Sequence, residues 1–308
     1  GNELAQKGLE LLKEDSFSLP KAKILLSMGA VKASQGQLAI ACDHMKEAIT
    51  ILEHLTRKEL LAIVLCNLAE VLLWRGLWEE AHEHAQTSSI LSEESMHKSG
   101  QTQAYIVLSM AELEMGFYSK ANQYARQANI LAHTLSAPDL IAVSHYIRAQ
   151  VLLGLKNPES AKNQLDEAYR HIQEHDPEEY KTSFELLLSI IELQLNLIEQ
   201  SQHHFSLAIE NVEQLQPVRK CEAYYLLARY YLYLQNFEKM NHYIDLGDAM
   251  ATQRAMWNWS LKLKALSLHS PHQIEKKTDD FHLLFDKLCF NMEDEQQSLL
   301  LTHLQHVT

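Results

Sequence analysis

Two histidines in one predicted helix have the spacing of a metal site. His171 and His175 are four residues apart, which places both imidazoles on one helical face, with Glu174 beside them. Two histidines at this spacing can share a zinc ion. In the metalloprotease pattern a glutamate directly follows the first histidine, and here Ile172 occupies that place. We therefore interpret the pair as solvated surface histidines and predict no metal site.

Other groups that could do chemistry lack a partner at a productive spacing. Two further histidine pairs are one or two residues apart, so their side chains point in different directions on a helix. They are His82 with His84 and His203 with His204. Paired carboxylates lie at helix starts, ends or surfaces, where solvation or the helix dipole explains them. They are Glu79-Glu80, Glu93-Glu94 and Glu178-Glu179. We interpret all of these as solvated surface residues.

The sequence carries no motif for an activated nucleophile. It has neither a Gly-rich phosphate loop nor a G-x-S-x-G elbow. The four cysteines are far apart and form no CxxC pair, which favours a reduced chain over a disulfide framework. They are Cys42, Cys66, Cys221 and Cys289. We predict that the protein is not an enzyme and that it has no catalytic residue and no cofactor.

The charge balance restricts the partners. Lys plus Arg number 27 and Asp plus Glu number 40, so the formal net charge is −13. Nucleic-acid binding needs a basic surface, and an acidic chain favours a basic or apolar partner. No apolar run approaches the roughly 18–20 residues of a membrane span, and the first residues do not resemble a secretory signal. We expect a cytoplasmic protein with a protein or peptide partner, without direct contact to nucleic acid or membrane.

Small residues recur along the chain at an almost fixed interval. Equivalent positions of successive copies form a column, and the residues of one column are separated by 40, 40, 40, 40 and 39 residues. It contains Ala41, Ala81, Ala121, Ala161, Ser201 and Met240. A second column, seven residues later, and a third, twelve residues earlier, hold small residues in all six copies. Because two helices approach closely only where side chains are small, each copy is predicted to be a packed helix pair.

A turn signal separates the two helices of each copy. Gly36, Gly76 and Gly116 follow the first helix of copies one to three and suit a left-handed C-cap. The fourth copy uses Lys156-Asn157-Pro158, and the sixth uses Gln235-Asn236-Phe237. In the fifth copy the turn is obscure: Asn196 holds the glycine slot, which leaves open a chain that continues as helix.

These columns together resemble the tetratricopeptide repeat (TPR). The first copy supplies the small, glycine, apolar and alanine positions of that pattern as Gly29, Gly36, Leu38, Ala41, Met45 and Ala48. The third supplies Ser109, Gly116, Tyr118, Ala121, Ala125 and Ala128. The period of 40 exceeds the usual period of about 34 residues, and is similar to the longer repeats of kinesin light chains, LGN-type proteins and MalT-like sensors. The resemblance implies an all-α, right-handed superhelical solenoid of antiparallel helix pairs.

The repeat divides the chain without a linker. Residues 1–15 fit the second helix of a truncated preceding repeat, and residues 16–252 hold six helix pairs. Residues 253–308 hold a weaker seventh pair and a C-terminal capping helix. The start in mid-repeat suggests a region excised from a longer protein. Its open ends would expose apolar surface, which predicts end-to-end self-association.

The TPR resemblance also implies which residues form the concave groove. In that family the groove is formed by fixed positions of each first helix. Transferred to this chain, they include polar, aromatic and apolar residues suited to holding a peptide or a helix. Those selected are Asn67, Glu70, Trp74, Met110, Tyr146, Gln150, Tyr225, Arg229 and Tyr233. The alternative is that some of the aromatic residues are core between neighbouring copies. Only Asn67 matches the two-carboxylate clamp of co-chaperone TPR domains, so a chaperone C-terminal peptide is not expected.

Two functions follow. The first is a non-catalytic interaction scaffold that binds a peptide or helix in an apolar and aromatic groove. The alternative is a ligand-sensing region of a larger bacterial signalling or transcription regulator, as the MalT-like resemblance implies. The domains that flank this region in the full-length protein would separate the two, because an upstream nucleotide-binding domain favours sensing.

Overall fold

The structure is a computed structural model that describes residues 7, 17–175, 178–271, 274–290 and 292–307. Within that part of the chain every regular element is a helix, which confirms the all-α prediction. No helix in it is both long enough and apolar enough to cross a membrane. Apart from Lys7, the predicted repeat remnant over 1–15 lies outside the described residues.

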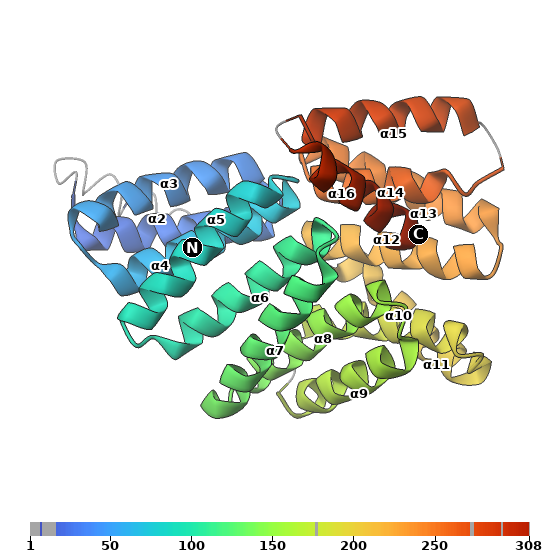
Figure 1. Ribbon diagram of the computed structural model, residues 1–308, viewed down its shortest axis with the longest axis horizontal. Coiled ribbons are helices and arrows are strands. Elements are labelled where there is room, and N and C mark those ends of the chain that lie inside the picture. The colour runs from blue at the N-terminus through green and yellow to red at the C-terminus, as the bar shows by residue number, and fades with distance from the viewer. Residues whose placement is uncertain (1–6, 8–16, 176–177, 272–273, 291, 308) are drawn as a thin grey trace.

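The helices follow one another as packed antiparallel pairs (Figure 1). The first three pairs are α2 (Leu19–Ser34) with α3 (Leu38–His54), α4 (Lys58–Trp74) with α5 (Trp78–Glu94), and α6 (Lys98–Glu114) with α7 (Tyr118–Leu135). The next three are α8 (Pro138–Gly154) with α9 (Pro158–His175), α10 (Glu178–Gln194) with α11 (Ile198–Ile209), and α12 (Pro217–Tyr233) with α13 (Phe237–Gln253). A short 3-10 helix, Val212–Gln214, follows α11. The chain ends with α14 (Trp257–Ser267), α15 (Ile274–Leu288) and α16 (Asp294–Val307).

The small columns lie where the paired helices cross. The alanines at positions 41, 81, 121 and 161 are completely buried. At three of the serine positions in these columns the hydroxyl reaches the backbone of the partner helix. Ser109 Oγ donates to the carbonyl oxygen of Ala121 at 2.8 Å, and Ser201 Oγ donates to that of Ser189 at 2.8 Å. A side chain as short as serine can do this only where the backbones are close, so the columns do mark helix crossings.

A left-handed residue ends the first helix of every one of the six repeats. Gly36, Gly76 and Gly116 have φ of 71°, 75° and 83°, as the C-cap prediction requires. Lys156, Asn196 and Gln235 occupy the same place in copies four to six, with φ between 53° and 58°. The fifth copy therefore does not continue as helix: α10 ends at Gln194, and the Asn196 turn leads into α11. Asparagine tolerates the left-handed region better than most residues, which explains the turn without glycine.

The superhelix curves until its C-terminal helices meet its first repeats. In Figure 1 the chain winds from α2 and α3 through α8 to α11, and α12 to α16 return beside the ends of α4 to α6. Helix α14 contacts α4, and α16 contacts both α14 and α8. Polar contacts cross this closure. They are Arg254 Nη1 to the Gln35 carbonyl oxygen at 2.7 Å, Trp78 Nε1 to Asn258 Oδ1 at 3.1 Å, Lys262 Nζ to Glu114 Oε1 at 2.5 Å and Tyr118 Oη to His303 Nδ1 at 2.9 Å.

The closure explains why only the first three turns use glycine. A Cβ on Gly116 would lie 2.9 Å from the backbone oxygen of Leu299 in α16. A Cβ on Gly36 would lie 2.8 Å from the Met256 side chain, and one on Gly76 would lie 3.3 Å from Leu288. The equivalent Lys156, by contrast, is exposed to solvent. The glycines thus permit the left-handed backbone and also the close approach of the C-terminal helices.

We predict that Gly116→Asn weakens the closure. Asn196 adopts the same backbone conformation in the fifth copy, so the substitution tests the contact with α16 rather than the turn. The overpacking is expected to cost about 1–3 kcal/mol of unfolding free energy. The measurements are chemical denaturation and hydrogen exchange of the α16 amides, which should exchange faster. The matched control is Lys156→Asn, at an exposed equivalent turn. If the two variants have equal stability, the closure contact is not significant.

Candidate ligand-binding cavity

The closure encloses a cavity with two adjoining chambers. The main chamber has a volume of about 360 Å³ and lies between the first helices α4, α6, α8 and α12 and the helix α14. The second, which we call the Arg229 chamber, has a volume of about 60 Å³ and lies between α6, α8, α10, α12, α14 and α16. The two share wall residues, namely Leu113, Gln150, Glu222 and Trp259. The concave side of this superhelix is therefore a partly enclosed space with two parts.

All nine residues selected from the sequence lie on the walls of this cavity. The main chamber is lined by Asn67, Glu70, Trp74, Met110 and Tyr146, among others. Gln150 lines both chambers, and the Arg229 chamber is lined by Tyr225, Arg229 and Tyr233. The transfer of TPR groove positions thus brings together side chains from four repeats. That these residues bind a ligand remains a prediction.

The selected aromatic residues differ in how far a ligand could reach them. Tyr146 is 2% exposed, stacks on Phe184 with ring centroids 4.3 Å apart and donates its hydroxyl to Glu222 at 2.8 Å. Tyr225 is 4% exposed, whereas Tyr233 is 42% exposed and is hydrogen-bonded by Gln194. Tyr146 therefore belongs largely to the core, as the alternative in the sequence analysis allowed, and Tyr233 stands at the rim.

The closure supplies cavity walls that the groove positions of the first helices do not predict. Asn258, Trp259 and Lys262 come from α14, and His303 comes from α16. From the sequence the seventh pair is a weak repeat and the last helix is a cap, so no residue of either is predicted to line the groove. One signal was present: in the sequence Lys262 lies between Leu261 and Leu263 in the middle of a predicted helix, and the structure shows it to be only 7% exposed.

A buried polar network holds α8, α10 and α12 together at the junction of the chambers. Glu222 accepts hydrogen bonds from the Tyr146 hydroxyl at 2.8 Å and the Ser183 hydroxyl at 3.0 Å. It also pairs with Arg219 at 3.0 Å, and that guanidinium lies 4.2 Å from the centre of the Tyr180 ring. Burial and the Glu222 charge raise the pKa of Tyr146 well above its usual value. Three partners hold the Glu222 carboxylate, so this side chain is a fixed part of the cavity wall.

A second buried ion pair links the closure to the cavity. Lys262 Nζ lies 2.5 Å from Glu114 Oε1, and the two side chains are 9% and 11% exposed. The Lys262 ammonium also lies 4.8 Å from the centre of the Trp259 ring. Because α6 carries Glu114 and α14 carries Lys262, the pair joins the third repeat to the seventh.

The structure describes part of the histidine and cysteine chemistry considered from the sequence. In the described part of the chain no group of three or more His, Cys, Asp or Glu residues could hold a metal ion. The His175 side chain lies outside that part. All four cysteines are free and buried. Cys66 lines the main chamber, but burial raises the pKa of its thiol to about 12, which disfavours the reactive thiolate.

Two histidines interpreted as solvated have buried partners instead. His82 Nε2 lies 3.2 Å from Glu112, and His204 Nδ1 lies 2.8 Å from Glu192. Both carboxylates belong to first helices and are almost fully buried, so the histidines of the second helices satisfy them. The hydrogen bond to Glu192 raises the pKa of His204. The interpretation as solvated surface residues was wrong for His82 and His204, because the sequence does not show which carboxylates become buried.

We predict that Glu114→Gln destabilises the protein by about 3–5 kcal/mol, because it leaves the Lys262 ammonium buried without a counter-charge. Adding Lys262→Met should recover most of the loss, since neither charge then remains buried. Thermal and chemical denaturation of the two single variants and the double variant measure the coupling. Strictly additive losses would show that the pair does not connect α6 to α14.

The comparisons with known proteins point to one kind of fold. No protein-family model matches the sequence, and no curated protein does either. Among solved structures, a Rap protein complexed with competence and sporulation factor is similar at 16% identity and a TM-score of 0.74, over 94% of this chain and 80% of that one. Aspartyl phosphate phosphatase F from Bacillus subtilis is similar at 14% identity and a TM-score of 0.65, over 92% and 74%.

A third solved structure, the apo form of RapI, is similar at 13% identity and a TM-score of 0.61, over 86% of this chain and 96% of that one. None of these three is a kinesin light chain, an LGN-type protein or a MalT-like sensor, so those narrower resemblances stay predictions. At such identities the likeness concerns the fold. Together with the packed helix pairs, it identifies this chain as an all-α solenoid of TPR-like repeats.

Proposed function

We propose that the protein is a non-catalytic binding module that encloses a short peptide in its cavity. The observation that carries the proposal is the enclosed main chamber, whose walls combine apolar side chains with separate polar groups. Its volume of about 360 Å³ lies within the range of ligand pockets. A Rap protein with a similar fold was solved in complex with competence and sporulation factor, which supports a binding role for this fold.

The side chains on the walls of the main chamber favour an extended peptide over a helix. Three consecutive first helices bring amide side chains to the chamber, namely Asn67 of α4, Gln103 of α6 and Gln150 of α8. An amide can donate and accept, as a peptide group does, so this row suits an extended backbone.

The reactive groups described on the cavity walls fit a binding role. Cys66 is the thiol in the chamber, and its raised pKa disfavours nucleophilic attack. The carboxylate of Glu222 is fully engaged by Tyr146, Ser183 and Arg219. We further propose that the protein acts in the cytoplasm, since four free cysteines suit a reducing compartment. End-to-end self-association and the character of the partner, basic or apolar, remain predictions.

A sensing role within a larger regulator is the second candidate function. Lys262 and His303 line the Arg229 chamber and also form contacts of the closure with Glu114 and Tyr118. A ligand that touches these two side chains would therefore change the stability of the closure. A ligand shifts a conformational equilibrium only if it binds one conformation more tightly than the other, and contacts made only in the closed form would have this effect.

The proposed function can be tested with a defined peptide mixture. Synthetic peptides of about five to eight residues would be mixed with the protein, and the bound ones identified by mass spectrometry after size exclusion. The test variant is Met110→Trp, which fills the main chamber from a half-buried position. The matched control is Ile130→Trp, on the outer surface at 63% exposure.

We expect the parent and Ile130→Trp to retain the same subset of peptides. Met110→Trp should retain about tenfold less, which corresponds to about 1.4 kcal/mol, while circular dichroism shows it to be folded. Tryptophan fluorescence gives a second readout, because Trp74 and Trp259 line the chamber. Equal retention by Met110→Trp, or no retention by the parent, would contradict the proposal.

A further inference from the structure

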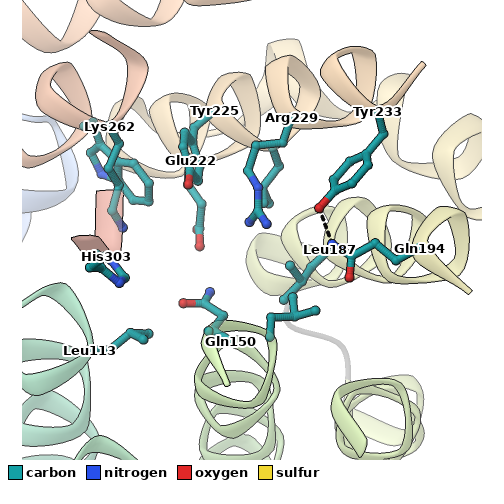
Figure 2. A pocket seen from close by; sticks show the side chains of 14 residues that line it. Leu113, Gln150, Leu187, Gln194, Glu222, Tyr225, Arg229, Tyr233, Lys262 and His303 are labelled. Atoms are coloured by element: carbon teal, nitrogen blue, oxygen red, sulfur yellow. Dashed lines mark hydrogen bonds between the residues drawn. The ribbon is translucent and has the colours of Figure 1, made fainter. Parts of the chain in front are cut away.

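Arg229 is a buried cation without a counter-charge. It is 7% exposed, and its guanidinium projects from α12 into the Arg229 chamber, above Gln150 and Leu187 (Figure 2). Its Nε is buried and has no hydrogen-bond partner. In the part of the chain that the structure describes, no hydrogen bond or ion pair engages the rest of the guanidinium. Its contact is with the ring of Tyr225, whose centre is 5.6 Å away.

The other charges on this side of the cavity are already neutralised. Lys262 is paired with Glu114 and Arg219 is paired with Glu222. Neither carboxylate forms an ion pair with Arg229, so the chamber keeps one positive charge in excess. Burying an unpaired charge is unfavourable, and proteins normally pair such a group or use it to bind a ligand.

The shape of the chamber suits a carboxylate. A guanidinium presents a planar fork of N–H donors that matches the two oxygens of a carboxylate. Figure 2 shows the Gln150 amide facing Arg229 across the chamber, where it could donate a further hydrogen bond to the same group. Leu113 and Leu187 line the same space and limit the access of water. The volume of about 60 Å³ admits a group of a few heavy atoms.

The main chamber has the opposite charge. Glu70 lines it without a hydrogen bond or ion pair from the described residues. Burial raises the pKa of its carboxyl group, and the charge of Arg219 on the same wall opposes this by favouring the carboxylate. Asp139, in the first turn of α8, is exposed and adds a second negative charge on that chamber. A ligand that spans both chambers would therefore be positive at one end and negative at the other. A peptide with free termini has this distribution of charge.

We propose that Arg229 binds the free C-terminal carboxylate of a short peptide whose amino-terminal half lies beside Glu70 in the main chamber. This inference rests on the proposed function, because it names the chemistry by which the same cavity would recognise its ligand. The C-terminal residue of the peptide would lie in the Arg229 chamber. A longer segment whose chain continues beyond that residue would therefore not fit the cavity.

The test compares two forms of the same peptide mixture, one with free C-terminal carboxylates and one with C-terminal amides. The variants are Arg229→Gln, which removes the charge, and Arg229→Lys, which keeps the charge and loses the fork. Arg170→Gln is the matched control, because its side chain is 67% exposed on α9. Thermal unfolding without peptide is measured for each protein, and inorganic phosphate is added in a separate series.

The parent and Arg170→Gln are expected to retain the free acids at least about tenfold better than the amides. Arg229→Gln should lose that preference, and Arg229→Lys should keep part of it. Without peptide, Arg229→Gln should unfold at or above the temperature of the parent, since it removes an unpaired buried charge. A lower temperature would indicate a structural role for Arg229 and would overturn the proposal.

Two results would separate this inference from the proposed function. If the parent retains acids and amides equally, and Arg229→Gln does the same, the carboxylate assignment fails while peptide binding stands. If phosphate raises the unfolding temperature of the parent but not of Arg229→Gln, and no peptide is retained, the chamber binds a small anion and both proposals fail.

Discussion

The contact between the C-terminal part of the chain and the turns of the first three repeats is the constraint on which the rest of the structure depends. Each repeat adds a small rotation to the stack, so the position of the last helices reflects the geometry of all the others. The three turn glycines leave room where a Cβ would meet α14, α15 and α16 or their neighbours. Hydrogen bonds and the Lys262–Glu114 pair then join the two ends of the superhelix.

Closure changes what the concave side can do. An open groove would leave its charged side chains in water, where an ion pair contributes little. In the enclosed cavity Glu222 and Glu114 are buried and need their partners. Arg229 stands apart because it is equally buried and unpaired. A deviation from the rule that buried charges are neutralised is expected at functional sites rather than in the core, and this directs attention to the Arg229 chamber.

The repeat could be predicted from the sequence because its signals lie close together in the chain. The small columns, the left-handed turns at Gly36, Gly76 and Gly116, and the groove positions of the first helices all depend on spacings within one copy. The roles of Lys262, Asn258 and His303 could not be predicted in this way, because they arise from the accumulated curvature of seven repeats. Nor does any spacing show that Glu192 becomes buried and needs His204.

The most direct test of the account is the distance between the first repeat and the last helix in solution. Spin labels on Glu53→Cys in α3 and Thr302→Cys in α16 would report it, because both sites are exposed and the four native cysteines are buried. A closed superhelix predicts one narrow distance distribution by double electron–electron resonance. A broad distribution would show that the ends move independently, in which case the enclosed cavity does not persist and the account is wrong.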